Sequence, residues 1–262
     1  MPDTGDPRIL LAMADHLATL TIARPEKLNA LDMDMVAALE RAAALIEAAS
    51  AIRVVILTGL GEKSFCAGGD IEAWARMSPL DFGRAWIRHG HRAFDALARL
   101  RQPLVAVLNG HVLGGGLELA AVADLRIAEA HVRIGAPETG LGMIPGWSGT
   151  QRVVRRFGAQ VTRRMALLGE VLPAREALAL GLVDAVAGRG EGMAEAQAWA
   201  ARLIERGPVA LELAKALINA AEGEEVERPL EAFAGALAAS TLDLKEGVAA
   251  FRARRRPKFR NE

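Results

Sequence analysis

The stretch LVAVLNGHVLGGGLELA, residues 104–120, decides the fold, because it joins a buried strand to a helix through a run of glycines. Residues 104–109 are apolar as far as Asn109 and predict a short strand buried on both faces. The glycines at 114–116 permit backbone conformations and close approaches that side chains forbid. We expect a helix to begin at about Leu117. Strands that alternate with helices at this spacing indicate an α/β fold with crossover connections.

Strands and helices also alternate on the N-terminal side of this stretch. Asn29 is interpreted as the N-cap of a helix that runs to about Ala49. The other elements predicted here are two hairpin strands at 9–14 and 17–22, a buried strand at 53–58 and a helix at 80–100.

The chain beyond the stretch changes to mostly helical sequence. Short strands are predicted at 125–128 and 132–135, and a brief extended piece at 182–184. Helices are predicted at 159–169, 173–180, 193–206, 208–221 and 228–254. We therefore expect an α/β core over residues 1–192 and a helical C-terminal region over residues 193–262.

Composition and charge exclude several classes of protein. Hydrophobic residues make up 52% of the 262, enough for a sizeable core, and 32 basic residues balance 32 acidic ones. A formal net charge of zero argues against a protein that coats nucleic acid or an anionic membrane. It also leaves room for self-association, because little long-range repulsion opposes it.

Cysteine usage and hydropathy suggest where the protein works. Cys66 is the one cysteine, so no internal disulfide can form and a reducing compartment is expected. Residues 1–7 carry two aspartates and no apolar run, unlike a signal peptide. No stretch is apolar for long enough to cross a bilayer. We expect a soluble cytoplasmic protein.

Two glycine loops each follow a short buried strand and precede helical sequence. The first is FCAGGDI, residues 65–71, and the second is GGGLE, residues 114–118. Two backbone N–H groups that converge from such loops can hold a developing oxyanion, helped by the helix N-terminus behind one of them.

Two glutamates near these loops are candidates for acid–base chemistry. Glu118 falls in the first turn of the helix that follows the second loop, among apolar neighbours. Glu138 comes 20 residues later, directly after a predicted strand and between Pro137 and Gly140. Such a pair can move protons on a bound carbonyl compound if the fold brings the two together, which spacing alone leaves open.

Four segments together closely resemble the enoyl-CoA hydratase/isomerase (crotonase) family. They are RPEKLNAL at 24–31, FCAGGDI at 65–71, NGHVLGGGLEL at 109–119 and PETGLGMIPGWSGTQ at 137–151, and they occur in the family's order. The resemblance runs from the opening hairpin to Lys245-Glu246-Gly247 near the end of the chain. It implies a spiral of ββα turns with a helical C-terminal region, and trimers that commonly pair into hexamers.

The resemblance also implies a reaction and its residues. Gly69 and Gly115 would donate N–H groups to a thioester oxygen, while Glu118 and Glu138 would hold a water between them. Glu118 would assist attack at C3 and Glu138 would give the proton to C2, although the two roles could be exchanged. The product of this syn addition to a trans-2-enoyl-CoA is a 3-hydroxyacyl-CoA, formed through a thioester enolate. No metal or redox cofactor is expected, because coenzyme A is part of the substrate.

The same resemblance implies where the substrate lies. The C-terminal region is expected to mediate oligomerisation and to cover coenzyme A. The acyl tail would meet some of Trp74, Met77, Phe82, Trp86, Met143 and Trp147. Coenzyme A would lie along Glu26, Lys27, Leu28, Ala67, Gly68, Gly69, Asp70, Ile71, Glu72, Gly114 and Gly115, with Phe251, Arg252, Lys258 and Phe259 close to its phosphates or adenine.

Several other interpretations have to be weighed against this one. His89 and His91 are too close together for one helix face and lack an obvious third ligand, so a surface helix is predicted rather than a metal site. Isomerases of the family typically keep only the equivalent of Glu138, so the presence of Glu118 as well favours hydration. Hydration of a specialised enoyl-CoA remains an alternative, as does a non-catalytic scaffold that binds acyl-CoA or RNA. The zero net charge and the two glutamates speak against the scaffold.

Overall fold

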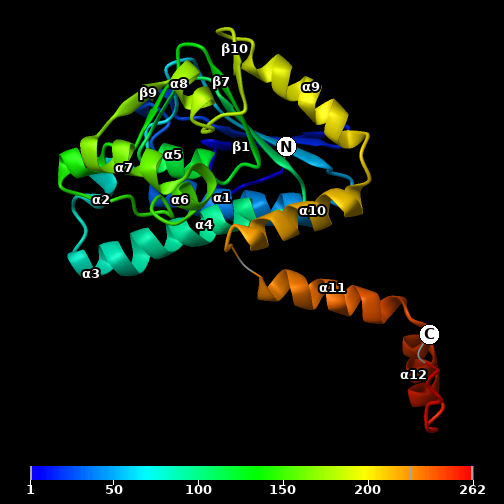
Figure 1. Ribbon diagram of the computed structural model, residues 1–262. Coiled ribbons are helices and arrows are strands. Elements are labelled where there is room, and N and C mark those ends of the chain that lie inside the picture. Colours follow the sequence, from blue (N-terminus) through cyan, green and yellow to red (C-terminus); the bar gives the residue numbers. More distant parts are fainter. Residues whose placement is uncertain (1, 225, 261) are drawn as a thin grey trace. The chain divides into compact units, whose positions relative to one another are not determined.

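Two β-sheets carry the fold in the computed structural model, which describes residues 2–224, 226–260 and 262 (Figure 1). The larger sheet has the order β1-β2-β3-β5-β7-β10 and the smaller one the order β4-β6-β8-β9. The strands are β1 Ile9–Ala14, β2 Leu17–Ile22, β3 Val54–Gly59, β4 Ser64–Cys66, β5 Leu104–Leu108, β6 His111–Leu113, β7 Leu125–Glu129, β8 Arg133–Gly135, β9 Val171–Pro173 and β10 Ala185–Ala187.

Successive turns of the chain add one strand to each sheet. The pairs β3 and β4, β5 and β6, and β7 and β8 each put their first strand in the larger sheet and their second in the smaller one. Neighbouring strands of successive turns pair in parallel. β3 and β5 are buried along their whole length, as expected for apolar parallel strands covered on both faces. The predicted spiral of ββα turns is confirmed.

The remaining elements are helices and helical turns, several of which connect the strands. They are α1 Met33–Ala48, α2 Ile71–Trp74, α3 Pro79–Asp81, the π-helix η2 Phe82–Ile87, α4 Arg88–Ala98, α5 Gly115–Ala120, α6 Arg152–Phe157, α7 Ala159–Leu168, α8 Ala174–Ala179, α9 Gly192–Ile204, α10 Pro208–Ala221, α11 Glu227–Ser240 and α12 Leu242–Arg252, with 3-10 turns η1 Pro25–Lys27 and η3 Glu138–Leu141. None of those among the described residues is long and apolar enough to cross a membrane.

The prediction that Asn29 caps the first long helix is wrong. The cap is Asp32, whose carboxylate accepts the N–H of Met35. Asn29 is fully buried with a left-handed backbone, and its amide donates to the carbonyl oxygens of Leu60 and Ser64. Its side chain therefore ties the first loop of the spiral to the second instead of starting a helix.

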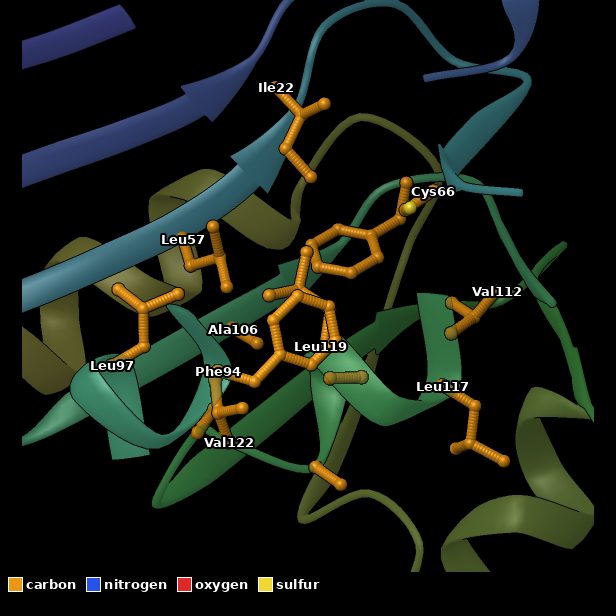
Figure 2. Packing of buried hydrophobic residues seen from close by; sticks show 14 of the residues in the cluster. Ile22, Leu57, Cys66, Phe94, Leu97, Ala106, Val112, Leu117, Leu119 and Val122 are labelled. Atoms are coloured by element: carbon orange, nitrogen blue, oxygen red, sulfur yellow. The ribbon is translucent and has the colours of Figure 1, made fainter. Parts of the chain in front are cut away.

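Two apolar clusters fill the faces of the larger sheet. Alternate residues of β3 and β5 point to opposite faces, as the strand period requires. Leu57 and Ala106 join the main cluster with residues of α1, α4 and α5, part of which Figure 2 shows. Val54 and Val105 face the other way, where they pack with Ala196 and Ala200 of α9. The apolar stretches of the sequence thus form a core on both sides of one sheet.

The chain divides into two compact units, Met1–Lys215 and Ala216–Glu262. Residues 193–215, which we assigned to the C-terminal region, therefore belong with the α/β core, because α9 packs on β3, β5 and β7. The role of the C-terminal region in oligomerisation and in covering coenzyme A stays a prediction.

The helix predicted at 228–254 is in fact two helices. Thr241 has an extended backbone, and its hydroxyl accepts the N–H of Leu244 to cap α12. Threonine was read as part of a continuous helical pattern, although it is also a favoured N-cap residue. The short elements α2, α6, β4, β6, β9 and β10 were not predicted either. Of these, β10 follows the extended piece expected at 182–184 and does not coincide with it.

Candidate active site

A cavity of about 180 Å³ lies where the two glycine loops meet. It is largely apolar, and both candidate glutamates line it. Its lining consists of Ala67, Gly68, Gly69, Ile71, Trp74, Phe82, Trp86, Ile87, Leu113, Gly114, Gly115, Glu118, Pro137, Glu138, Leu141, Met143, Ile144, Gly146 and Trp147.

The first loop aims a backbone N–H away from the core. Leu31 forms a parallel bridge with Gly69, in which the N–H of Leu31 donates to Gly68 and its carbonyl accepts from Asp70. In such a bridge the N–H of the opposing residue points to the other side. The N–H of Gly69 is thereby turned from Leu31, and Gly69 lines the cavity.

The second loop meets the first at backbone distance. A Cβ atom on Gly68, which has a left-handed φ of +97°, would lie 2.9 Å from the nitrogen of Gly115. Gly115 is the first residue of α5, so its N–H has no acceptor within that helix. The structure therefore brings the N–H groups of Gly69 and Gly115 to one cavity, with glycine required at Gly68 for the approach.

Glu118 is buried and held by a backbone turn. Its Oε1 accepts the N–H groups of Trp147 and Gly149, each at 2.6 Å. Burial raises the pKa of Glu118 to about 7, the Trp147 N–H opposes that rise, and the charge of Glu138 adds to it. A carboxyl that titrates near neutral pH can take up or release a proton under ordinary conditions.

Glu138 begins η3 and lines the same cavity. Both carboxylate oxygens are buried, and no group of another described residue donates a hydrogen bond to them. Burial is the main cause that raises the pKa of this carboxyl. Burying a carboxyl without a protein partner costs free energy unless the carboxyl is protonated or bonded to a ligand. A protonated carboxyl that faces a ligand is what a proton donor in an active site requires.

Trp147 fills a slot made by glycines. A Cβ on Gly90 would lie 2.0 Å from two atoms of the Trp147 indole, and one on Gly115 would lie 3.0 Å from Cε3. Trp147 is 2% exposed. Its indole lies 5.0 Å from the ring of Trp86, tilted by 34°, and donates from Nε1 to the Trp86 carbonyl. Trp147 lines the cavity, and its contact with the substrate stays a prediction. Gly90, in the first turn of α4, was the sequence signal for this slot.

The other residues that were predicted to contact the acyl tail fall into two groups. Trp74, Phe82, Trp86 and Met143 line the cavity, whereas Met77 is absent from its lining and packs against the core. Sequence reasoning missed Ile87, Leu141 and Ile144 as lining residues. Leu141 and Ile144 are apolar residues in the glycine-rich segment that follows Glu138, and this position was the sequence signal that they line the cavity.

The residues predicted to bind coenzyme A lie in both units. Beside the cavity, the N–H of Ala67 donates to the Leu28 carbonyl, and Lys27 pairs with Glu72 at 2.8 Å. Phe251 and Lys258 belong to the C-terminal unit, where Phe251 is 85% exposed. Their contact with coenzyme A stays a prediction. No group of three or more potential ligands among the described residues could hold a metal ion.

Comparison with known proteins gives consistent matches along the chain. Residues 13–262 match the family described as enoyl-CoA hydratase/isomerase. The chain is 36% identical to the crotonyl-CoA hydratase of Syntrophomonas wolfei, over 96% of this chain and 97% of that protein. It is 38% identical to the short-chain-enoyl-CoA hydratase of Clostridium acetobutylicum, over 93% and 94%. The crystal structure of an enoyl-CoA hydratase from Bacillus anthracis superposes with a TM-score of 0.80 at 32% identity, covering 97% of this chain and 100% of that one.

Proposed function

The chain belongs to the enoyl-CoA hydratase/isomerase family, and on this basis we propose that it adds water across the double bond of a trans-2-enoyl-CoA to give a 3-hydroxyacyl-CoA. The observation that carries the proposal is the pair Glu118 and Glu138. Both line one cavity, both have raised pKa values, and the converging glycine loops lie beside them.

The thioester carbonyl binds between the N–H groups of Gly69 and Gly115. Attack on C3 of the enoyl group moves charge onto this oxygen, so the two donors stabilise the enolate more than the substrate. One such donor is typically worth about 10²–10³ in rate. The short α5 behind Gly115 adds its N-terminal partial charge at the same position.

The two glutamates have different roles in proton transfer. Two carboxyls in one apolar cavity resist ionising together, so the reactive form has one of them protonated and the other ionised. Glu118, whose Oε1 is fixed by two N–H groups, acts as the ionised partner that takes a proton from the attacking water. Glu138 keeps the proton and gives it to C2. The proton that Glu118 has taken from water then passes to Glu138, which restores the pair for the next turnover. Water enters and the proton is delivered from the same side, which makes the addition syn.

The acyl group that fits is short. The cavity of about 180 Å³ is bounded by Trp86, Ile87 and Trp147, and a Cβ on Gly146 would already lie 2.6 Å from Cδ1 of Ile87. Coenzyme A extends from the cavity past Glu26, Lys27 and Leu28. The protein needs no metal or redox cofactor, works in the cytoplasm and assembles as trimers or as pairs of trimers.

Loss of the conjugated-thioester absorbance on addition of crotonyl-CoA tests the proposal. We expect rapid loss, with 3-hydroxybutyryl-CoA as the product identified by mass. The same protein incubated with a 3-enoyl-CoA distinguishes the isomerase alternative, because an isomerase would generate conjugated absorbance without adding water. Conversion of the 3-enoyl-CoA together with no hydration of crotonyl-CoA would replace the proposed reaction by double-bond migration.

A further inference from the structure

We propose that His91 is a positioning residue for Glu118, and that it acts through the hydroxyl of Ser148. The inference rests on the proposed function for its catalytic consequence. Its structural basis is a single hydrogen bond of 2.9 Å between His91 Nδ1 and Ser148 Oγ, which links α4 to the backbone turn that holds the carboxylate.

The turn concerned is residues 146–149. Its two N–H groups on Trp147 and Gly149 converge on the same oxygen of Glu118, and Ser148 lies between them. Their direction therefore depends on the backbone angles of Ser148. A rotation of that peptide would move one N–H group or both away from the carboxylate.

Ser148 has a backbone conformation that its side chain disfavours. Its φ is +82°, in the left-handed region where a residue with a Cβ atom is strained. It is also buried, with 8% of its surface exposed. Such a conformation persists only where the surroundings hold it in place. The bond to His91 is a contact made by the serine side chain itself, and the Ser148 carbonyl is held by the N–H of Arg152.

The helix that carries His91, α4, is firmly packed in the core. α4 packs against α1, and its residues Phe94 and Leu97 are fully buried in the core (Figure 2). Gly90 of the same helix accepts the Trp147 indole. The turn is thus fixed to α4 at two successive residues, by the indole of Trp147 and by the hydroxyl of Ser148. The indole of Trp147 fills a gap beside α4, while the hydrogen bond to His91 fixes the orientation of the Ser148 side chain.

The first test compares His91→Ala with wild-type protein in the hydration of crotonyl-CoA. We expect kcat to fall roughly 10-fold, in line with the sensitivity of catalysis to small misplacements, while KM changes less than about 2-fold. His91→Gln, which keeps a hydrogen-bonding side-chain end, should recover most of the loss. His89→Ala is the matched control, because residue 89 is about 200° around the helix from residue 91, and its kcat should equal that of the wild type.

A second variant separates the bond from folding. Ser148→Gly removes the hydroxyl but accepts the left-handed backbone without strain, so it should fold as well as the wild type. It should lower kcat as His91→Ala does, and the double variant should lose no more than either single one. In a Glu118→Gln background His91→Ala should have no further effect. Equal losses in both backgrounds, or wild-type kcat in His91→Ala, would overturn the proposal.

A measurement without turnover keeps the inference apart from the proposed function. In protein labelled with ¹³C at the glutamate carboxyls, the Glu118 resonance is assigned by Glu118→Gln and titrated by NMR. The N–H groups of Trp147 and Gly149 lower the pKa of Glu118, so loosening them in Ser148→Gly should raise it, while the charge of Glu138 beside it is unchanged. An unchanged titration would refute the positioning role even if crotonyl-CoA proved not to be a substrate. An inactive wild-type protein with a shifted titration would refute the proposed function alone.

Discussion

Among single residues, Glu118 shows most clearly how function opposes stability. Its carboxyl is buried and its pKa is raised from 4.5 to about 7 by burial. In the unfolded chain the group ionises at its ordinary pKa. Between these two values the folded protein holds a proton that the unfolded chain has released, so this group lowers stability as pH rises through the window. Above pH 7 the whole penalty is present.

Glu118→Gln should therefore stabilise the protein in alkaline but not in acidic solution. A shift of one pKa unit corresponds to about 1.36 kcal/mol, so the gain in the free energy of unfolding should approach roughly 3 kcal/mol at pH 8 and vanish near pH 4.5. Urea denaturation at several pH values measures it. Glu205→Gln, at an exposed glutamate, is the control and should show no such trend. A gain of equal size at both ends of the range would show that burial of the charge is not its origin.

Gly69 gives a second prediction at the residue scale, because the indole of Trp86 lies very close to it. A Cβ atom at this position would lie 2.6 Å from Cζ2 of Trp86, closer than such contacts occur. Gly69→Ala should displace the N–H donor and lower kcat/KM roughly 10- to 100-fold. Adding Trp86→Leu should recover much of the loss for crotonyl-CoA, since the smaller side chain leaves room for the methyl group. Failure of the second change to help would mean that the indole is not the obstacle.

At the scale of elements, the longer strands β1, β2, β3, β5 and β7 and the glycine loops could be predicted because their signals are local. The strand period places Val55 and Leu57 on one face of the sheet and Val54 and Ile56 on the other, and both hairpin strands have the predicted bounds. The loops could be recognised because only glycine permits the approach seen at Gly68.

The missed features depend on contacts that are distant in sequence. Asn29 has the residue type of a cap, yet its amide bonds to carbonyls more than 30 residues away. His91 was interpreted as a surface residue, and its partner Ser148 lies 57 residues further along the chain. No local pattern identifies either bond. The two glutamates could be predicted as a pair only through the resemblance to a family, since spacing alone did not bring them to one cavity.

The segment from α2 through η2 to α4 supplies the aromatic wall that should limit the acyl chain. Trp86→Ala removes a large part of this wall, so the ratio of kcat/KM for trans-2-decenoyl-CoA to that for crotonyl-CoA should rise about 10-fold, comparable to the effect of a few methylenes in an apolar pocket. Trp199→Phe, in α9 on the opposite face of the larger sheet, is the control and should leave the ratio unchanged. An unchanged ratio in Trp86→Ala would place the limit elsewhere.

At the scale of the whole molecule, the chain consists of a unit that holds the cavity and a smaller helical unit. The smaller one carries exposed apolar side chains, among them Leu237 at 72% and Phe251 at 85%. Isolated soluble chains rarely leave such groups uncovered in number. With a formal net charge of zero, repulsion does not oppose assembly.

We therefore expect the purified protein to self-associate, and the resemblance to the family predicts that it sediments as a trimer or a pair of trimers rather than as a monomer. Sedimentation velocity over a hundredfold range of concentration measures it. Phe251→Glu places a charge on the apolar surface and should shift the distribution to smaller species if that surface is covered in the assembly. A monomer at all concentrations would contradict the expectation.

Hydration of crotonyl-CoA by the wild type, Glu138→Gln and Glu118→Gln is the measurement that tests the central claim most directly. A positioned acid or base contributes about 10²–10⁴ in rate, so each variant should lose at least that much kcat/KM while it keeps the fold and binds the thioester. The double variant should lose less than the product of the two single losses, because the glutamates act on one water. Full activity in either single variant would contradict the claim that the pair performs the reaction.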